Sequence, residues 1–489
     1  MKNHRALLSA LALATLAGCS SDLVDPLQPL HPSLSVAAAS ETGTYLVRFK
    51  GNGVPKEFAA QVARLGGEVI FAHAGAGIAA VAGLDDADAD QLAAMGGVAA
   101  VDADAYTTLD EPIDVAVDAF EGAPESPTDP TAAFFFPRQW NMRAVSAPAA
   151  WAAGKLGSAT TRVGILDTGI DYLHPDLYGR VDLTLSRSFL SAAENARVQA
   201  NFPGAHEIAD LNYHGTHVAA TVVSNGLEAA GVTSQVTLVG LKVCAPGTPA
   251  NGFQGTCPTS GTLAAILYAA DIGLDVINMS LGGTFNRRDA SARGGNGPSF
   301  LATINQVMNY ANRKGTAIVV SAGNSALDID HDGNGYKSYC SAAAVICVSA
   351  TGPTAQASVN GPWQNVDALA SYSNYGRSGI DVAAPGGNVS AVWAACSGFT
   401  LHPALAGCRS RFYDPATGAW SASVVGLTGT SMAAPHVTGL AALIVSEGAR
   451  GPSQIQARLQ QSADDLGQPG TDPAYGKGRI NVARAVGAN

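Results

Sequence analysis

The region 138–489 constrains the fold most, because short Val- and Ile-rich segments alternate there with longer helical stretches. Five of its apolar segments have the length of buried strands, and they are residues 162–167, 237–243, 276–280, 317–322 and 345–349. Parallel strands need a long crossover connection, which is usually a helix. The alternation therefore predicts an α/β fold, in which helices flank both faces of a parallel sheet.

Composition excludes several other classes of protein. The chain has 489 residues, of which 47% are hydrophobic and 14% are charged, so it can build a large core and is not a disordered chain. The net charge is -11, which offers no basic surface for a polyanion, and nucleic acid is not expected as a partner. No apolar run reaches the roughly 18–20 residues that a membrane-spanning helix requires.

The N-terminus predicts export. A basic start is followed by an apolar stretch over 6–18, which is typical of a secretory signal. The stretch ends in Leu16-Ala17-Gly18-Cys19, which resembles the lipobox of bacterial lipoproteins and implies acylation of Cys19. An ordinary signal with a cysteine near small residues is the alternative. In the lipobox interpretation, residues 1–19 are the signal and 20–42 a tether to a transient lipid anchor.

Residues 43–109 form a separate small unit by their pattern. Strands are expected at 44–50, 68–72, 78–81 and 98–107, and helices at 55–65 and 85–95. This order, β-α-β-β-α-β, is that of a ferredoxin-like α+β fold. Residues 110–137, which are rich in Pro and acidic residues, are predicted to be an exposed linker.

The cysteines also favour an oxidising compartment. Apart from Cys19 there are six, and their separations of 13, 7 and 12 residues suggest the pairs Cys244–Cys257, Cys340–Cys347 and Cys396–Cys408. Buried free thiols are the alternative. Zinc is less expected, because the chain has no CxxC spacing.

Three short motifs carry the residue types of a nucleophilic triad. Asp167 ends a predicted strand, while His214 and Ser431 each begin an apolar helical stretch. A serine hydroxyl needs a base such as a neutral histidine to take its proton, and a buried carboxylate orients that histidine. Each residue by itself would more often be a cap or a turn residue, so the argument depends on their occurring together.

The order Asp, His, Ser along the chain differs from that of chymotrypsin and of the α/β-hydrolases. Together with the flanking residues, the motifs closely resemble those of subtilisin-like serine proteases over about 138–485. The resemblance implies that Asp167 orients the base, His214 is the base and Ser431 is the nucleophile. It also implies that Asn324, in the motif SAGN, supplies an oxyanion donor.

The same resemblance implies a substrate cleft and a precursor. Residues Ser280, Leu281 and Gly282 match the segment that borders the cleft, and its lack of charge favours apolar side chains in the first subsite. Residues 43–109 resemble the inhibitory propeptide of the family. The expected protein is thus a secreted serine endopeptidase that acts on proteins or peptides and cuts its own precursor within 108–136.

Three other interpretations stay open at this point. They are a lipase or esterase, a surface module that binds without turnover, and a specific processing protease in place of a broad degradative one. The missing Gly-x-Ser-x-Gly elbow argues against the first, because residue 433 is Ala where that motif has Gly.

No cofactor is expected for catalysis, and a calcium site for stability is one interpretation of the acidic segment 328–332. Asp328, Asp330 and Asp332 have the D-x-D-x-D-G spacing of a calcium loop, although the twelfth position, which should be Glu, is Tyr339. Subtilases often bind calcium for stability, and in relatives one site uses the residue that matches Asp176. The loop at 222–230 is short for that site. A solvated acidic loop at 328–332 is the alternative.

Overall fold

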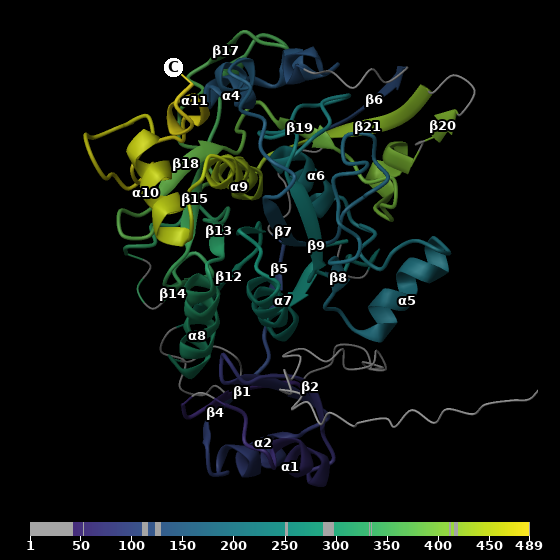
Figure 1. Cartoon of the computed structure of the whole chain (residues 1–489), viewed down its shortest axis with the longest axis vertical. Coiled ribbons are helices and arrows are strands. Elements are labelled where there is room, and N and C mark those ends of the chain that lie inside the picture. The colour runs from purple at the N-terminus through teal and green to yellow at the C-terminus, as the bar shows by residue number, and fades with distance from the viewer. Residues whose placement is uncertain are drawn as a thin grey trace, which may run out of the picture.

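The computed structural model describes residues 43–488, except 52, 110–115, 123–128, 250–252, 287–297, 332, 334, 410–411 and 415–418. Cys19 and the expected signal and tether lie outside the described residues. Two units follow one another along the long axis of the molecule, with the small N-terminal unit at the bottom of Figure 1 and the larger unit above it.

The small unit has the predicted order of elements. Its bounds are β1 (Tyr45–Phe49), α1 (Phe58–Arg64), β2 (Glu68–His73), β3 (Ile78–Ala82), α2 (Asp86–Ala93) and β4 (Val98–Ala103). The strands form an antiparallel sheet in the order β2-β3-β1-β4. Alternate residues of β1 face opposite sides, as a strand requires: Tyr45 and Val47 pack under the helices of the unit, whereas Leu46 joins the core of the larger unit.

The last predicted strand, 98–107, is interrupted. β4 ends at Ala103, and β5 (Tyr106–Thr108) leaves the sheet to pair with β10 (Thr256–Pro258) of the larger unit. The cause is a contact that no local pattern contains. The carboxylate of Asp104 accepts hydrogen bonds from the backbone N–H of Ser260, at 3.0 Å, and from its hydroxyl, and so holds the chain at the start of helix α7 (Thr259–Asp271).

A seven-stranded parallel sheet forms the centre of the larger unit, as predicted, in the order β18-β15-β13-β11-β7-β9-β8. Its strands are β7 (Arg162–Asp167), β8 (Arg187–Ser188), β9 (Thr237–Lys242), β11 (Val276–Met279), β13 (Ala317–Ser321), β15 (Ile346–Thr351) and β18 (Val382–Pro385).

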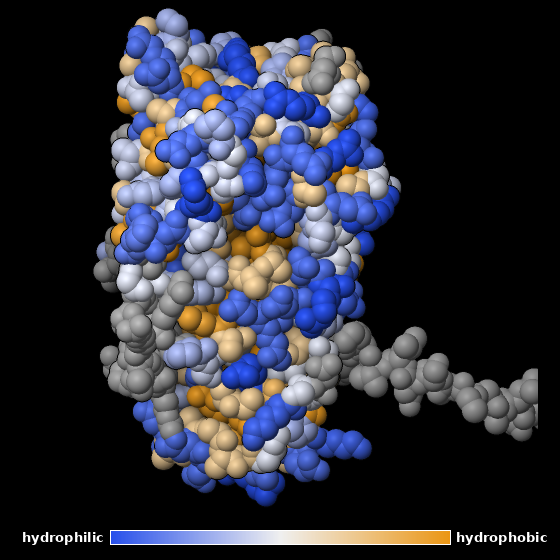
Figure 2. Space-filling model, turned by 90° about the vertical axis from the view of Figure 1, so that its left-hand side faces the viewer, coloured by the Kyte–Doolittle hydropathy of each residue, from blue (hydrophilic) through white to orange (hydrophobic). Residues whose placement is uncertain are grey.

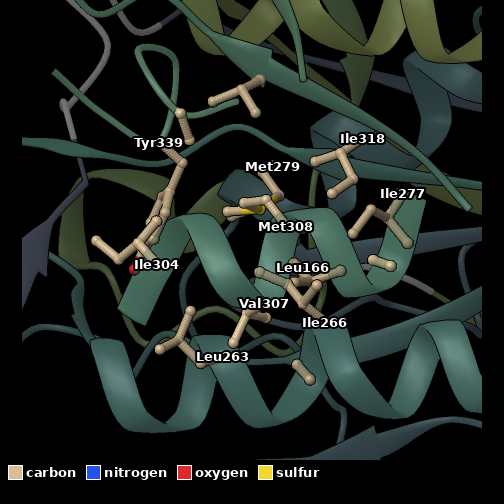
Figure 3. Packing of buried hydrophobic residues seen from close by; sticks show 14 of the residues in the cluster. Leu166, Leu263, Ile266, Ile277, Met279, Ile304, Val307, Met308, Ile318 and Tyr339 are labelled. Atoms are coloured by element: carbon tan, nitrogen blue, oxygen red, sulfur yellow. The ribbon is translucent and has the colours of Figure 1, made fainter. Parts of the chain in front are cut away.

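Helices cover both faces of this sheet. Those of the larger unit are α3 (Trp140–Ala144), α4 (Ala147–Ala152), α5 (Ala192–Asn201), α6 (His214–Val222), α7 (Thr259–Asp271), α8 (Pro298–Lys314), α9 (Thr430–Ser446), α10 (Pro452–Ser462) and α11 (Val482–Ala485). On one face, Ile266 of α7, Val307 of α8 and Ile277 of β11 belong to one apolar cluster (Figure 3). Val276, its neighbour in the strand, packs with α9 and α10 on the other face.

A second, antiparallel sheet lies at one end of the larger unit. It consists of β19 (Val392–Ala395), β20 (Phe412–Asp414), β21 (Ala419–Leu427) and β6 (Ala116–Gly122). β6 falls inside the segment predicted to be an exposed linker, and it forms a strand there that the sequence did not predict. β6 pairs with β21 from Gly122↔Trp420 to Ala116↔Gly426. The pairing satisfies the backbone groups of an edge that would otherwise be open.

The remaining elements are short. They are β12 (Gly283–Asn286), β14 (Gly335–Ser338), β16 (Ala355–Gln356), β17 (Trp363–Gln364) and the 3-10 turns at Pro130–Ala132, Phe136–Arg138 and Pro403–Arg409.

All three expected disulfides are present, linking Cys244 to Cys257, Cys340 to Cys347 and Cys396 to Cys408. On the face shown in Figure 2, hydrophilic residues cover most of the surface and apolar residues appear between them. In the described part of the chain, no helix has both the length and the apolar character needed to span a bilayer.

Candidate active site

Asp167 stands at the carboxyl end of β7, a strand with five of its six residues buried. Its side chain is fully buried, and its Oδ1 accepts a hydrogen bond from the backbone N–H of Thr168 at 2.7 Å. A carboxylate in a dry environment requires hydrogen bonds and a partner that compensate for the lost water.

His214 is that partner. Its Nδ1 lies 2.8 Å from Oδ1 of Asp167, and its side chain is 1% exposed. The close approach of α6 to β7 requires glycine at residue 215, because a Cβ there would overlap the carbonyl oxygen of Gly169. The backbone N–H of His214 donates to Oδ1 of Asn212 at 3.1 Å, which fixes the first turn of the helix.

Ser431 is the second residue of α9, and α9 packs against α6. The hydroxyl of Ser431 donates to the carbonyl oxygen of Ser280 at 3.3 Å, a long hydrogen bond, and the hydroxyl of Ser280 donates to the Ser431 carbonyl at 2.8 Å. The segment expected to border the cleft thus lies directly against the expected nucleophile. Leu281 and Gly282 continue it and are buried.

Asn324 follows β13 and comes close to the same helix start. Its Oδ1 accepts hydrogen bonds from the backbone N–H and from the hydroxyl of Thr430, each at 2.8 Å. These bonds fix the orientation of the amide and turn its Nδ2 donor away from Thr430. A Cβ built on Gly429 would lie 3.3 Å from that Nδ2, so the amide lies at the turn that precedes Ser431.

The sequence did not reveal two residues that hold this arrangement. Thr430 also accepts the N–H of Gly323 at 2.9 Å, which links the Asn324 loop to α9. Asp210 accepts hydrogen bonds from the N–H of Thr216 at 3.0 Å and from its hydroxyl at 2.7 Å, which caps the helix of His214. The only signals in the sequence were the place of Thr430 beside Ser431 and that of Asp210 four residues before His214. Both are also ordinary helix-capping patterns.

Three further histidines serve the packing. His174 makes hydrogen bonds to main-chain groups of Ser423 and Asp176. His217 bonds to the carbonyl of Val392 at 3.0 Å, and burial lowers its pKa to about 3. His436 bonds to the carbonyl of Met432 and to the amide of Asn141, and burial lowers its pKa to about 4. The last two are therefore neutral at pH 7.

The expected metal residues point to hydrogen-bond donors. Asp330 accepts the N–H groups of Arg377 and Ser378, at 2.6 and 3.0 Å, and Asp328 lies 2.8 Å from Nδ1 of His331. Asp332 lies outside the described residues. Within the described ranges, no group of three or more His, Cys, Asp or Glu side chains is arranged to hold a metal ion. The calcium set stays a prediction.

Asp176 is engaged in a similar way. Its carboxylate accepts three backbone N–H groups, those of Leu227, Glu228 and Ala229, at 2.8 to 3.0 Å. Main-chain donors thus contact both oxygens of this carboxylate. Burial and the nearby charge of Asp176 raise the pKa of the Glu228 carboxyl well above its usual value.

A buried Asp–His pair and a serine at a helix start, on the edge of a parallel α/β sheet, are the groups that a serine hydrolase site requires. The sequence profile of the subtilase family matches residues 158–478. The chain is 31% identical over 340 residues to a thermophilic serine proteinase of Bacillus sp. (strain AK1), covering 69% of this chain and 64% of that protein. It is also 31% identical over 364 residues to thermitase of Thermoactinomyces vulgaris, covering 74% and 99%.

The fold agrees with these matches. A crystal structure of the epidermin leader peptide processing serine protease of Staphylococcus aureus superposes with a TM-score of 0.65, at 20% identity, over 91% of this chain and 98% of that one. The chain belongs to the subtilase family and is a subtilisin-like serine endopeptidase. Members of the family use an Asp-His-Ser triad and are made as precursors.

Proposed function

We propose that Asp167, His214 and Ser431 carry out peptide hydrolysis. The single observation that carries this proposal is the buried contact of 2.8 Å between Nδ1 of His214 and Oδ1 of Asp167. His214 lies on α6, which packs against α9, the helix of Ser431. Nδ1–H donates to Asp167, which leaves Nε2 as the basic nitrogen of the imidazole. The carboxylate holds this tautomer and stabilises the imidazolium that forms.

The steps follow from these positions. When substrate binds, the Ser431 hydroxyl turns from the Ser280 carbonyl toward His214. Its Oγ attacks the carbonyl carbon of the scissile bond while Nε2 takes the proton. His214 then gives that proton to the leaving amine, and an acyl group stays on Oγ. Water, deprotonated by the same nitrogen, releases the acyl group as a carboxylate.

Asn324 and the N–H of Ser431 would stabilise the oxyanion. Negative charge develops on the carbonyl oxygen during attack, and donors that already point at it need no reorganisation. Thr430 holds the amide of Asn324 by two hydrogen bonds of 2.8 Å. Ser280, Leu281 and Gly282 would border the substrate chain on the other side of Ser431. Catalysis through these residues uses no cofactor.

The assignment is tested with Ser431→Ala. We expect this variant to stay a full-length precursor, to have no peptidase activity and to escape labelling by a fluorophosphonate. Ser446→Ala is a matched control on the same helix, because Ser446 donates only to Ala442 and contacts Thr161. Activity in the Ser431 variant would refute the assignment.

We also infer that residues 43–109 act as the propeptide, helping the larger unit to fold and then inhibiting it. Three contacts support this. Asp104 caps the start of α7 through Ser260, and His73 lies 2.8 Å from Asp271 at the end of that helix. Leu109, which is 1% exposed, donates its N–H to the carbonyl of Gly255 at 3.0 Å.

The first cut would separate β5 from β6, inside the expected region 108–136. β5 pairs with β10, and β6 pairs with β21, the strand that leads to the helix of Ser431. The described chain therefore lies against the protease unit on both sides of residues 110–115. N-terminal sequencing of the mature enzyme tests this proposal, and a new N-terminus beyond residue 122 would contradict it.

Export and a lipid on Cys19 complete the proposal. The three disulfides suit an oxidising compartment. If Cys19 is acylated, the lipid is attached to the part that is cut away, and maturation releases the protease. Ser431→Ala should then remain in the membrane fraction while the wild-type catalytic domain becomes soluble. Equal retention of both would reject release by maturation.

A further inference from the structure

We propose that Asn278 is a positioning residue for peptide hydrolysis, because its side-chain amide directs the hydroxyl of Ser280 onto the main chain of Ser431. The inference rests on the proposed function, since it takes Ser431 as the nucleophile. Asn278 acts through Ser280 and requires no contact with the substrate. The inference depends on a chain of three hydrogen bonds, the relay, which joins Thr438, Asn278, Ser280 and Ser431.

The relay begins inside α9. Thr438 lies seven positions after Ser431 on this helix. Its hydroxyl oxygen lies 2.8 Å from Oδ1 of Asn278, on β11, and 3.2 Å from the carbonyl oxygen of Ala434. Both partners can only accept, so the single hydroxyl proton is directed at the nearer of them, which is the amide oxygen of Asn278.

The amide of Asn278 passes this polarity on to Ser280. Its Nδ2 lies 2.9 Å from Oγ of Ser280. An amide nitrogen only donates, so this oxygen accepts, and the proton of Ser280 is directed at the carbonyl oxygen of Ser431, 2.8 Å away. The three bonds therefore donate in one direction, from Thr438 to Ser431. Bonds arranged in this way strengthen one another in a medium of low dielectric constant.

The last bond of the relay replaces a donor that α9 lacks. In an α-helix the carbonyl of Ser431 would accept the N–H of the residue four positions later. That residue is Pro435, which has no N–H. A buried carbonyl without a donor costs free energy, and the hydroxyl of Ser280 supplies a donor from outside the helix. The start of α9 is therefore held by Ser280 at the residue that would carry out the attack.

The relay is closed to solvent. Thr438, Asn278 and Ser280 are each 0% exposed, and Ser431 is 3% exposed. Asn278 lies on β11, whose four residues are all buried, and α9 packs against this strand. A buried amide is stable when both its donor and its acceptor are paired. A change at Asn278 is therefore transmitted to Ser280 and is not absorbed by water.

The relay fixes the nucleophile relative to the segment beside it. The hydroxyl of Ser431 donates to the carbonyl of Ser280 at 3.3 Å, while the hydroxyl of Ser280 donates to the carbonyl of Ser431 at 2.8 Å. The first bond breaks when the Ser431 hydroxyl turns toward His214, and the second bond remains. It then keeps Ser431 in place against residues 280–282, which would border the substrate chain. Displacing a reacting group by about 1 Å can lower the rate roughly 100-fold.

The opposite orientation of the Asn278 amide is disfavoured by the same contacts. With the amide turned over, Nδ2 would donate to Thr438, and Oδ1 would take the proton of Ser280. The carbonyl of Ser431 would then lose the Ser280 donor in a helix that already has proline at residue 435. The observed orientation pairs all of these groups.

Asn278→Asp tests the direction of the relay. The variant keeps the shape of the side chain, but a carboxylate only accepts, so it would take the proton of Ser280 away from the carbonyl of Ser431. With a p-nitroanilide peptide that the wild-type enzyme cuts, we expect kcat at about pH 8 to be lower by about 10–100-fold and KM to stay within about threefold. Thr438→Val, which removes only the first donor, should lower kcat by about 3–10-fold.

The pH dependence separates positioning from a general loss of structure. Burial raises the pKa of a carboxyl group, and the protonated acid can donate to Ser280 again. The ratio of kcat in Asn278→Asp to kcat in the wild-type enzyme should therefore rise at least about threefold between about pH 8 and about pH 5.5, because the titration of His214 cancels in this ratio. Thr303→Val is the control, since Thr303 is buried in α8 and its hydroxyl donates to the carbonyl of Ser299 in the same helix at 3.3 Å. It should leave kcat and its pH profile unchanged.

An Asn278→Asp enzyme with the wild-type kcat, or with a ratio that does not change with pH, would overturn the inference. If this variant stays a precursor, the same ratio is measured for the rate of self-cleavage on a gel. If it does not accumulate, Thr438→Val decides, and a kcat equal to that of Thr303→Val overturns the inference. Fluorophosphonate labelling of Ser431 separates these failures from that of the proposed function, because a wild-type enzyme that neither reacts with the probe nor cuts any peptide would overturn both.

Discussion

Replacing Asn374 by Ala should weaken both the stability and the activity of the enzyme. The side chain is fully buried and makes three hydrogen bonds to one loop: Nδ2 donates to the Ala322 carbonyl at 2.8 Å, and Oδ1 accepts the N–H groups of Ser325 and Leu327 at 3.1 and 2.9 Å. This loop carries Asn324. The amide of Asn374 therefore positions the proposed oxyanion donor without touching the substrate.

The size of the effect follows from these contacts. Three buried hydrogen bonds at about 0.5–1.5 kcal/mol each amount to about 2–4 kcal/mol. With an unfolding entropy of about 2 cal/mol/K per residue, a chain of this length loses about 1 °C of Tm per kcal/mol. We expect a Tm lower by about 2–4 °C. We also expect a kcat lower by about 10–100-fold, because displacing a catalytic group by about 1 Å can lower the rate roughly 100-fold.

Two backgrounds separate these effects. Thermal unfolding is measured on the Ser431→Ala precursor, which cannot digest itself, and kcat on the mature enzyme with a saturating peptide. Asn388→Ala serves as a control, because Asn388 accepts only one exposed side-chain hydrogen bond, at 3.4 Å from Ser371. An Asn374→Ala enzyme with unchanged kcat and a Tm within about 0.5 °C of the parent would refute this reasoning.

Three other predictions follow from the structure. Burial lowers the pKa of His217 to about 3 and that of His436 to about 4, below the unfolded value of 6.5, so the stability is full above pH 6.5 and falls as the pH drops toward 4. In equilibrium unfolding, His436→Gln in the Ser431→Ala precursor should make this loss of stability with falling pH shallower. An unchanged slope of the unfolding free energy against pH would contradict the prediction. Asp330→Ala should lower Tm by about 1–2 °C equally with and without added calcium, because Asp330 accepts hydrogen bonds from Arg377 and Ser378. A decrease in Tm that is seen only with calcium would favour a metal site instead. Gly323→Ala should reduce maturation strongly, because a Cβ at residue 323 would overlap the end of the Lys337 side chain and φ is +97°. Normal maturation of this variant, seen on a gel, would contradict the overlap.

Much of the fold could be predicted because its signals are local. Apolar segments of strand length alternate with helical ones, and this alternation predicted the parallel sheet. The elements of the small unit were found from their periodicity, and the three disulfides from separations of 13, 7 and 12 residues. Each of Asp167, His214 and Ser431 alone would be an ordinary cap or turn residue, and their motifs stood out because they occur together and in the order Asp, His, Ser.

Contacts between distant residues decided the rest. β6 forms because β21, some 300 positions later, offers an open edge, and no composition of a Pro- and acid-rich segment could reveal that edge. Asn374 supports the Asn324 loop, and Lys337 lies on Gly323, only after β12 and β14 have paired and the loops have closed. Local sequence determined which elements form and which chemical groups they carry. Tertiary packing determined which of these groups meet, because it brings buried charges and backbone donors from separate elements into one volume.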